Sequence, residues 1–327
     1  MNNMEKMKIL VAGCGSIGLR HLRCLALRAD CRLLACDANS GVEKQIKEIS
    51  PDIQFFDDYS KALAAGPELV VVCTPNELHE KFATEAFDAG AHVLCEKPIA
   101  HTIESGERIV AAAKRADRIL AVGYTERFRP AFKFIQEKVR SGEMGNLVGG
   151  RSVVGSYKTL MCAKSDFRSH CFGIILVDFT HELDMLHSIF GPVANVDCKG
   201  NSIACKEIPS LPSLVAMLLE YRTGAVVSIH FDYVQHPQRR IIDIYGDKQT
   251  LVYDMEVNTV TVFDSNSEES QVFSFPCERD SLFACEHENM IQAIRMGRAV
   301  MVNGEQALQS LAIAEEAINI LSSNNNL

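Results

Sequence analysis

The sequence contains no basic run longer than two residues, no Cys-x-x-Cys spacing and no long apolar segment. Its 33 lysines and arginines stand against 42 aspartates and glutamates, and the net charge of −9 repels nucleic acid and anionic membranes. No stretch approaches the roughly 18 apolar residues that a membrane helix needs. The N-terminal MNNMEKMKIL also lacks the apolar centre of a signal peptide. We therefore expect no nucleic-acid and no membrane partner.

The twelve cysteines are scattered through a chain of 327 residues and do not form the dense framework of a small secreted domain. Several, such as Cys36, Cys73 and Cys95, lie inside apolar runs typical of buried strands. A free cysteine packs as a small hydrophobic residue. We interpret these side chains as reduced thiols and expect a cytoplasmic protein.

The chain is long enough for two domains, and its patterning changes near residue 123. Before that point, wholly apolar runs alternate with helical patterns, which predicts a doubly wound parallel sheet of the Rossmann type over residues 1–122. From 123 to 327, many alternating runs separated by Gly, Asn or Asp come between and after two helical patterns, and two more helical patterns end the chain. This part predicts an α/β domain with an open, mostly antiparallel sheet.

A glycine-rich motif follows the first predicted strand and opens a helix. It comprises Gly13, Cys14, Gly15, Ser16, Ile17 and Gly18. In this context the glycines permit a tight turn, close approach of a pyrophosphate and close helix packing, and the helix N-terminus attracts the phosphates. The next strand ends at Asp37, whose carboxylate can bind both ribose hydroxyls and would repel a 2′-phosphate. We expect NAD as the cofactor, with NADP less favoured. The alternative is that the glycines only form a turn and Asp37 only caps a loop.

Two later strands end in polar sequences that should lie at the same carboxyl edge of the sheet. The first is CTPNELH, in which Thr74, Pro75, Asn76 and His79 are candidate cofactor contacts. Two interpretations stay open for Asn76 and His79, since the first could form a turn with Pro75 and the second could be a surface helix residue.

The second such sequence is HVLCEKPIAH, which places Glu96 and Lys97 directly after a buried strand. A charged pair at this tip should lie beside the nicotinamide. Pro98 fixes the chain direction there and, if its peptide bond is cis, would turn the tip sharply. We expect Lys97 to contact both cofactor and substrate, and Glu96 to hold Lys97 or the cofactor ribose.

In the second half, Asp178, His181 and Asp184 follow one another at helical spacing. Apolar neighbours at 174–177 indicate that this helix start is buried. The alternative is that Asp178 caps the helix and the rest form a solvated face.

Taken together, GCGSIGLRHLRCL, VVCTPNELHEKFATEAFDAGAHVLCEKPIA, VGYTERFRPAF and GIILVDFTHELDML resemble the glucose-fructose oxidoreductase, inositol dehydrogenase and MocA (Gfo/Idh/MocA) family. The resemblance covers most of residues 7–190 and implies a Rossmann domain followed by an α/β domain whose open sheet forms dimers or tetramers. It implies NAD(P)-dependent oxidation of a sugar or polyol hydroxyl, or reduction of the ketone. The family's lysine corresponds to Lys97, and its aspartate and histidine correspond to Asp178 and His181, which here are three residues apart where much of the family has four.

Oxidising an alcohol requires a base for the hydroxyl proton while hydride leaves the carbon. His181 can accept that proton, since an unperturbed histidine has a pKa near ~6.5. The Lys97 ammonium can stabilise the developing negative charge on the oxygen. Asp178 could orient the imidazole or bind a second hydroxyl. Further candidate substrate contacts are Tyr124, Arg127, Arg168 and, with less support, His236; each arginine could instead form a surface salt bridge.

The sequence therefore predicts an NAD-dependent oxidoreductase acting on a sugar, sugar derivative or cyclitol, without a metal. Two alternatives remain at this point. One is an NAD-dependent glycosidase that works through transient oxidation, and the other is a catalytically silent protein that senses NAD or sugar.

Overall fold

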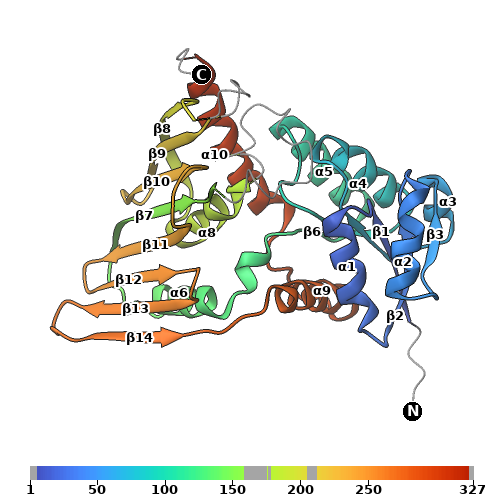
Figure 1. Cartoon of the computed structure of the whole chain (residues 1–327), viewed down its shortest axis with the longest axis horizontal. Coiled ribbons are helices and arrows are strands. Elements are labelled where there is room, and N and C mark those ends of the chain that lie inside the picture. Colours follow the sequence, from blue (N-terminus) through green and yellow to red (C-terminus); the bar gives the residue numbers. More distant parts are fainter. Residues whose placement is uncertain (1–5, 158–174, 176–177, 205–211, 324–327) are drawn as a thin grey trace. The chain divides into compact units, whose positions relative to one another are not determined.

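The computed structural model describes residues 6–157, 175, 178–204 and 212–323. These residues form two compact units (Figure 1). The first comprises residues 1–125 and 278–308, and the second comprises 126–277 and 309–327. The predicted boundary near residue 122 stays a prediction. The structure adds that residues 278–308 group with the first unit.

The first unit contains a six-stranded parallel sheet in the order β3-β2-β1-β4-β5-β6. Its strands are β1 (Met7–Ala12), β2 (Cys31–Cys36), β3 (Gln54–Phe56), β4 (Leu69–Val72), β5 (His92–Cys95) and β6 (Leu120–Val122). Every residue of β4 is buried, as expected for a strand with helices on both faces. The order reverses direction between β1 and β4, and ligands bind at the carboxyl ends of the strands beside such a reversal.

Helices cover this parallel sheet. They are α1 (Ser16–Ala26), α2 (Glu43–Ile49), α3 (Tyr59–Ala64), α4 (His79–Asp88), α5 (Ile103–Ala116) and α9 (Arg279–Met296), with short 3₁₀ turns η1 (Ser40–Val42), η2 (Asn76–Leu78) and η3 (Thr125–Phe128). Leu22 and Leu25 of α1 and Met290 and Ile291 of α9 share one hydrophobic core with the sheet. Helix α9 is therefore an integral part of the first unit although it follows the second sheet in the sequence.

The second unit contains an eight-stranded sheet in the order β14-β13-β12-β11-β7-β10-β9-β8. Its strands are β7 (Leu147–Gly155), β8 (Val193–Asn201), β9 (Leu214–Tyr221), β10 (Val226–Asp232), β11 (Arg239–Gly246), β12 (Gln249–Asp254), β13 (Thr259–Asp264) and β14 (Ser270–Ser274). Among the strands that the structure describes here, β7 and β10 pair in parallel and the other pairs are antiparallel. This confirms the predicted fold class.

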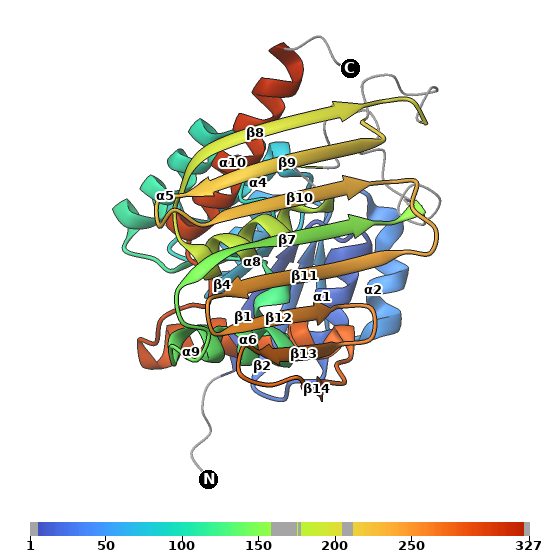
Figure 2. The same cartoon turned by 90° about the vertical axis from the view of Figure 1, so that its left-hand side faces the viewer.

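One face of the eight-stranded sheet is covered by α6 (Pro130–Arg140), α8 (Thr180–Phe190) and the second half of α10 (Gly304–Ser323). Strand β9 alternates strictly, with Val215, Met217, Leu219 and Tyr221 buried toward these helices. Figure 2 views the opposite face of this sheet, over which no labelled helix of the unit passes. Among the described residues, no helix of this unit covers that side of the sheet, which we call the open face.

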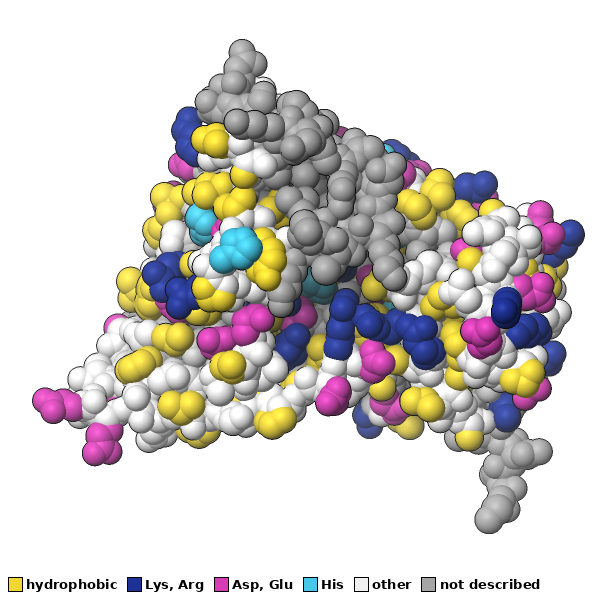
Figure 3. Space-filling model, viewed as in Figure 1, with side chains coloured by type: hydrophobic (Ala, Val, Ile, Leu, Met, Phe, Trp, Pro, Cys, Tyr) yellow, Lys and Arg dark blue, Asp and Glu magenta, His cyan; other side chains and the backbone are white. Residues whose placement is uncertain are grey.

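The nine cysteines that the structure describes are all free thiols, and six of them are buried. Along the described ranges, none of the helices combines the length and apolar character needed to cross a membrane. On the face shown in Figure 3, basic side chains are mixed with acidic and uncharged ones.

Candidate active site

The loop between β1 and α1 has the geometry that its glycines predict. Gly13 has a φ of +90°, and a Cβ built on it would lie 2.7 Å from the carbonyl carbon of Cys73. A Cβ on Gly18 would lie 1.9 Å from the carbonyl oxygen of Gly13. Gly15 is exposed and has nothing within 4 Å of the Cβ position. Two glycines thus serve close packing, and the third leaves one side of the loop open to a ligand.

Gly15 is also the N-cap of α1, whose first turn contains no acidic residue. The first amide groups of a helix lack partners within the helix and attract anions. The loop and the helix start therefore fit a pyrophosphate, which is the group that the glycine motif predicts.

Asp37 lies directly after β2, next to this loop. Its Oδ2 accepts a hydrogen bond of 2.7 Å from the Cys14 amide, and its Oδ1 accepts one of 2.8 Å from the Asn39 amide. Strands β1 and β2 are parallel neighbours, which explains why residues 14 and 37 meet. Asp37 thus lies beside the glycine loop at the carboxyl edge of the parallel sheet. Burial, followed by the negative charge of Asp37, raises the pKa of the Cys14 thiol to about 12, so this thiol stays neutral.

The loop after β4 carries Thr74, Pro75, Asn76 and His79. His79 begins α4 and is only 1% exposed, so the interpretation of it as a surface residue is wrong. Its Nδ1 lies 2.9 Å from the carbonyl oxygen of Pro98, and its Nε2 lies 2.9 Å from that of Thr74. Burial lowers the pKa of His79. The imidazole therefore connects the loop after β4 to the loop after β5, which contains Lys97.

Glu96 and Lys97 follow β5, and the Lys97–Pro98 peptide bond is cis. The Glu96 side chain is 13% exposed, and its Oε1 lies 3.0 Å from Nε2 of His21. Its Oε2 accepts a hydrogen bond of 3.2 Å from the amide of Lys97. Burial opposes ionisation, but the hydrogen bond and charge of His21, together with Lys97, lower the pKa of Glu96. Glu96 is thus a carboxylate that supports the backbone of Lys97.

Asp178 and His181 lie in the second unit. Asp178 accepts a hydrogen bond from the hydroxyl of Tyr233, and Tyr233 is buried. The N-cap of α8 is Phe179, whose side chain makes no capping bond, and Asp178 lies one residue before it. His181 is half-buried in the first turn of α8.

Of the other predicted contacts, Tyr124 is completely buried and Arg127 is 4% exposed. Arg127 forms a two-point ion pair with Asp184. This agrees with the alternative in which the arginine pairs with an acid, but the pair is buried and not on the surface. The His236 ring stacks on Tyr157 with 3.7 Å between the ring centroids. Arg168 lies outside the described residues.

Sequence reasoning missed a second group of charged side chains around α8. Glu182, the neighbour of His181, is completely buried and accepts a hydrogen bond of 2.6 Å from Arg240. Arg240 also approaches Glu126 at 3.3 Å, and Glu126 pairs with Arg129. Although burial opposes it, Arg240, His181 and Arg129 together lower the pKa of Glu126 to about 2. The sequence offered one signal for this group: Glu182 falls in the first turn of α8, close to the predicted site residues Asp178 and His181.

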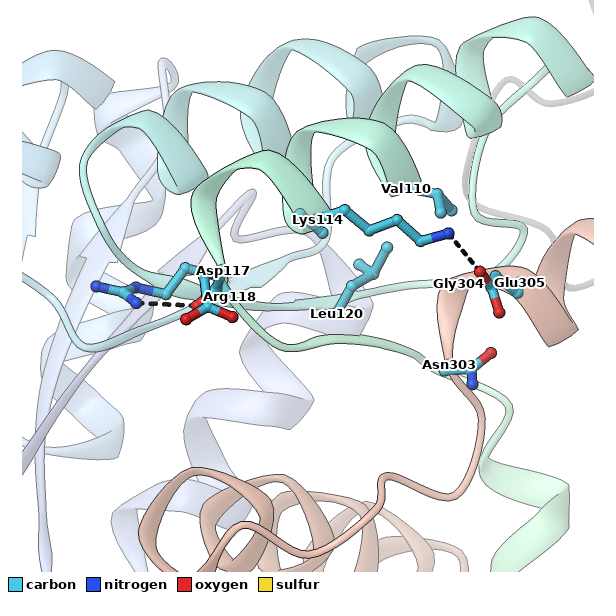
Figure 4. A pocket seen from close by; sticks show the side chains of 9 residues that line it. Val110, Lys114, Asp117, Arg118, Leu120, Asn303, Gly304 and Glu305 are labelled. Carbon is cyan, nitrogen blue, oxygen red and sulfur yellow. Dashed lines mark hydrogen bonds and ion pairs between the residues drawn. The ribbon is translucent and has the colours of Figure 1, made fainter.

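A cavity of about 410 Å³ opens between α5 and the start of α10 (Figure 4). Lys114 and Glu305 form an ion pair across it, and Arg118, Leu120 and Asn303 also line it. The described residues that line this cavity include none of the predicted site residues.

Residues 7–124 match the family described as "Oxidoreductase family, NAD-binding Rossmann fold", and residues 136–325 match its "C-terminal alpha/beta domain". The chain is 26% identical over 326 residues to the myo-inositol 2-dehydrogenase of Thermotoga maritima, covering 95% of each chain. In fold it is similar to levoglucosan dehydrogenase in complex with NADH and levoglucosan, at a TM-score of 0.89 and 18% identity over 98% of each chain. It is also similar to the WlbA dehydrogenase of Bordetella pertussis with NADH and UDP-GlcNAcA, at a TM-score of 0.84 and 23% identity over 98% of this chain and 97% of that one.

Proposed function

The chain belongs to the Gfo/Idh/MocA family of oxidoreductases with an NAD-binding Rossmann domain, and on this basis we propose that it oxidises a hydroxyl of a sugar, sugar derivative or cyclitol. The reverse reaction reduces the corresponding ketone. The relatives named above are called dehydrogenases of inositol and levoglucosan or are bound to a nucleotide sugar, and each of these molecules is a ring with several hydroxyls. That shared chemistry supports the proposed substrate class.

The observation that carries the proposal is the carboxyl edge of the parallel sheet. The glycine loop follows β1, Asp37 follows β2 and Lys97 follows β5, so one sheet edge carries all three. Parallel strands at a switch point bring such residues to one ligand. A dinucleotide held by Gly15, the start of α1 and Asp37 supplies the hydride acceptor. Thr74, Pro75 and Asn76, after β4 at the same edge, are further candidate cofactor contacts.

We assign Lys97, His181 and Asp178 to the chemistry. The Lys97 ammonium donates a hydrogen bond to the substrate oxygen and stabilises its negative charge as the O–H bond breaks. His181 takes the hydroxyl proton. Asp178, held by the Tyr233 hydroxyl, orients the imidazole or binds a second hydroxyl. The substrate loses a proton and a hydride, and the products are a ketone, NADH and a proton. Tyr124 and Arg168 are further candidate substrate contacts, and we assign Arg127 to supporting α8.

The test is a panel of inositols, free sugars and nucleotide sugars, each incubated with NAD or NADP and followed by nicotinamide absorbance. The proposal predicts reduction of NAD with at least one member of the panel. Release of free sugar from a glycoside without net NADH would replace the proposal with the glycosidase mechanism. Binding of NAD without any turnover would indicate a catalytically silent sensor.

We also propose that two or four copies of the chain associate through the open face of the eight-stranded sheet. Leu218, Val226, Phe263 and Val272 point to this face and are 44–66% exposed. Their strands β9, β10, β13 and β14 span most of the width of the sheet. Apolar side chains spread over an uncovered sheet face are typical of an interaction surface. The free, mostly buried thiols support a reducing, cytoplasmic location.

A further inference from the structure

Four ionisable side chains meet inside the first unit, away from the predicted cofactor contacts except for Glu96. They are His21 of α1, Glu96 after β5, and Glu286 and His287 of α9. His21 and His287 are completely buried, and Glu286 is 3% exposed. Burying four such groups requires that their polar atoms and charges be compensated.

Hydrogen bonds join three of these side chains in a row. Nε2 of His287 lies 2.7 Å from Nδ1 of His21, and Nε2 of His21 lies 3.0 Å from Oε1 of Glu96. The other oxygen of Glu96, Oε2, accepts a hydrogen bond from the backbone amide of Lys97. The row therefore begins in α9 and ends on the backbone of the residue assigned to the substrate oxygen.

Two arrangements of protons satisfy the hydrogen bonds in this row. An ionised carboxylate only accepts hydrogen bonds, so Nε2 of His21 must carry a proton toward Glu96. A neutral His21 accepts at Nδ1 the hydrogen bond that Nε2 of His287 donates, whereas a His21 imidazolium donates from Nδ1 to Nε2 of His287. Burial, followed by the charges of His21 and Arg28, lowers the pKa of His287 well below its ordinary value, in agreement with a neutral ring. In both arrangements His287 is the neutral ring and His21 donates its Nε2 proton to Glu96.

Glu286 complements this row. Its carboxyl oxygens have no hydrogen-bond partner in the described part of the chain, and one of them lies within 4.8 Å of the ligand atoms of His21 and Glu96. Burial, and then the negative charge of Glu96, raises the pKa of Glu286 well above its ordinary value. Two adjacent buried carboxyls do not both ionise, so Glu286 is the neutral acid and Glu96 the single negative charge.

We propose that His21, Glu286 and His287 are positioning residues that fix Glu96 and, through it, the backbone of Lys97. This inference rests on the proposed role of Lys97. The competing explanation is plain packing, because the His21 ring also contacts Phe283 edge-on with 5.0 Å between centroids.

The first test compares substitutions that keep or remove the hydrogen bonds. His21→Phe retains a ring but removes both bonds, and we expect kcat to fall at least tenfold while the Kd for NADH changes less than threefold. His21→Gln retains a donor toward Glu96 and should recover part of that loss. Likewise Glu286→Gln, which mimics the neutral acid, should recover most of the kcat lost in Glu286→Ala. Cys285→Ala, at an exposed position of α9, controls for general effects on the helix. Equal kcat in His21→Phe and the wild type would overturn the proposal.

A second test does not require turnover and therefore separates this inference from the proposed function. Nitrogen-15 NMR of histidine-labelled protein should find His287 neutral and a proton on Nε2 of His21 between pH 6 and 8. An imidazolium signal from His287, or a His21 ring without a proton on Nε2, would overturn the proposal. Elemental analysis of the purified protein should find no stoichiometric metal. A divalent ion that is bound by the wild type and lost in Glu286→Gln would overturn the proposal, because the cluster would then be a metal site.

Discussion

Arg127 and Asp184 form a two-point ion pair inside the second unit, with Nε 2.6 Å from Oδ2 and Nη2 3.1 Å from Oδ1. The side chains are 5% and 1% exposed. The pair joins η3 to α8, the helix that begins beside Asp178 and contains His181.

Removing one partner should destabilise the protein strongly, because the other charge is left buried. We expect Arg127→Ala to lower the free energy of unfolding by about 3–5 kcal/mol in urea denaturation. Arg140→Ala is the control, since Arg140 pairs with Glu137 at the surface and its loss should cost about 1 kcal/mol or less. Similar small effects for both variants would contradict the structural role of Arg127.

The glycine loop allows a test that separates folding from cofactor binding. Gly15→Ala should keep the wild-type stability, because nothing lies within 4 Å of the new methyl group, but should weaken NAD binding at least tenfold. Gly18→Ala should instead destabilise the fold, since its methyl group would overlap the Gly13 carbonyl oxygen. Thermal unfolding and NAD titration of both variants check this. Unchanged NAD affinity in Gly15→Ala would contradict the assignment of the loop.

Asp37 should determine the preference for NAD over NADP. Asp37→Asn removes the charge and keeps one oxygen, which can accept the hydrogen bond from the Cys14 amide, while the bond from the Asn39 amide is lost. We expect the ratio of kcat/KM for NAD to that for NADP to fall at least tenfold, since the carboxylate would otherwise repel the 2′-phosphate. Asp52→Asn, an exposed position, is the control. An unchanged ratio would assign cofactor selection to other residues.

The open sheet face should carry the subunit contact. Leu218→Glu would place a charge on this face, and we expect light scattering to show a smaller mass than for the wild type. Leu27→Glu, at a position 88% exposed in the first unit, should leave the mass unchanged. A monomeric wild-type protein would contradict the proposed assembly.

Most strands could be predicted from the sequence, and those that were missed share one property. The missed strands β3, β8 and β14 lie at edges of their sheets. An edge strand has one hydrogen-bonded neighbour and covers less of the core, so its apolar pattern is weak; in β14 no residue is buried. The interior strands carry the continuous or alternating apolar runs that sequence patterns detect.

The placement of Asp37 and Lys97 was also predictable. Both residues directly follow strands of a parallel sheet, and the ends of such strands lie at the same carboxyl edge. The row from His287 to Glu96 was not predictable, since His21 and His287 are 266 residues apart. Nothing local in α9 indicates that it packs in the first unit. The pairing of Arg127 with Asp184 was also hidden, because each side chain alone is consistent with a solvated position.

The central claim is that Lys97 and His181 carry out the chemistry. The most direct measurement is the rate of NADH formation in a single turnover, with a substrate found in the panel, for the wild type, Lys97→Ala and His181→Ala. We predict that each substitution lowers this rate at saturating NAD by roughly 10²-fold or more. Lys114→Ala, which removes a surface ion pair, should retain the wild-type rate. A wild-type rate in Lys97→Ala or His181→Ala would contradict the account.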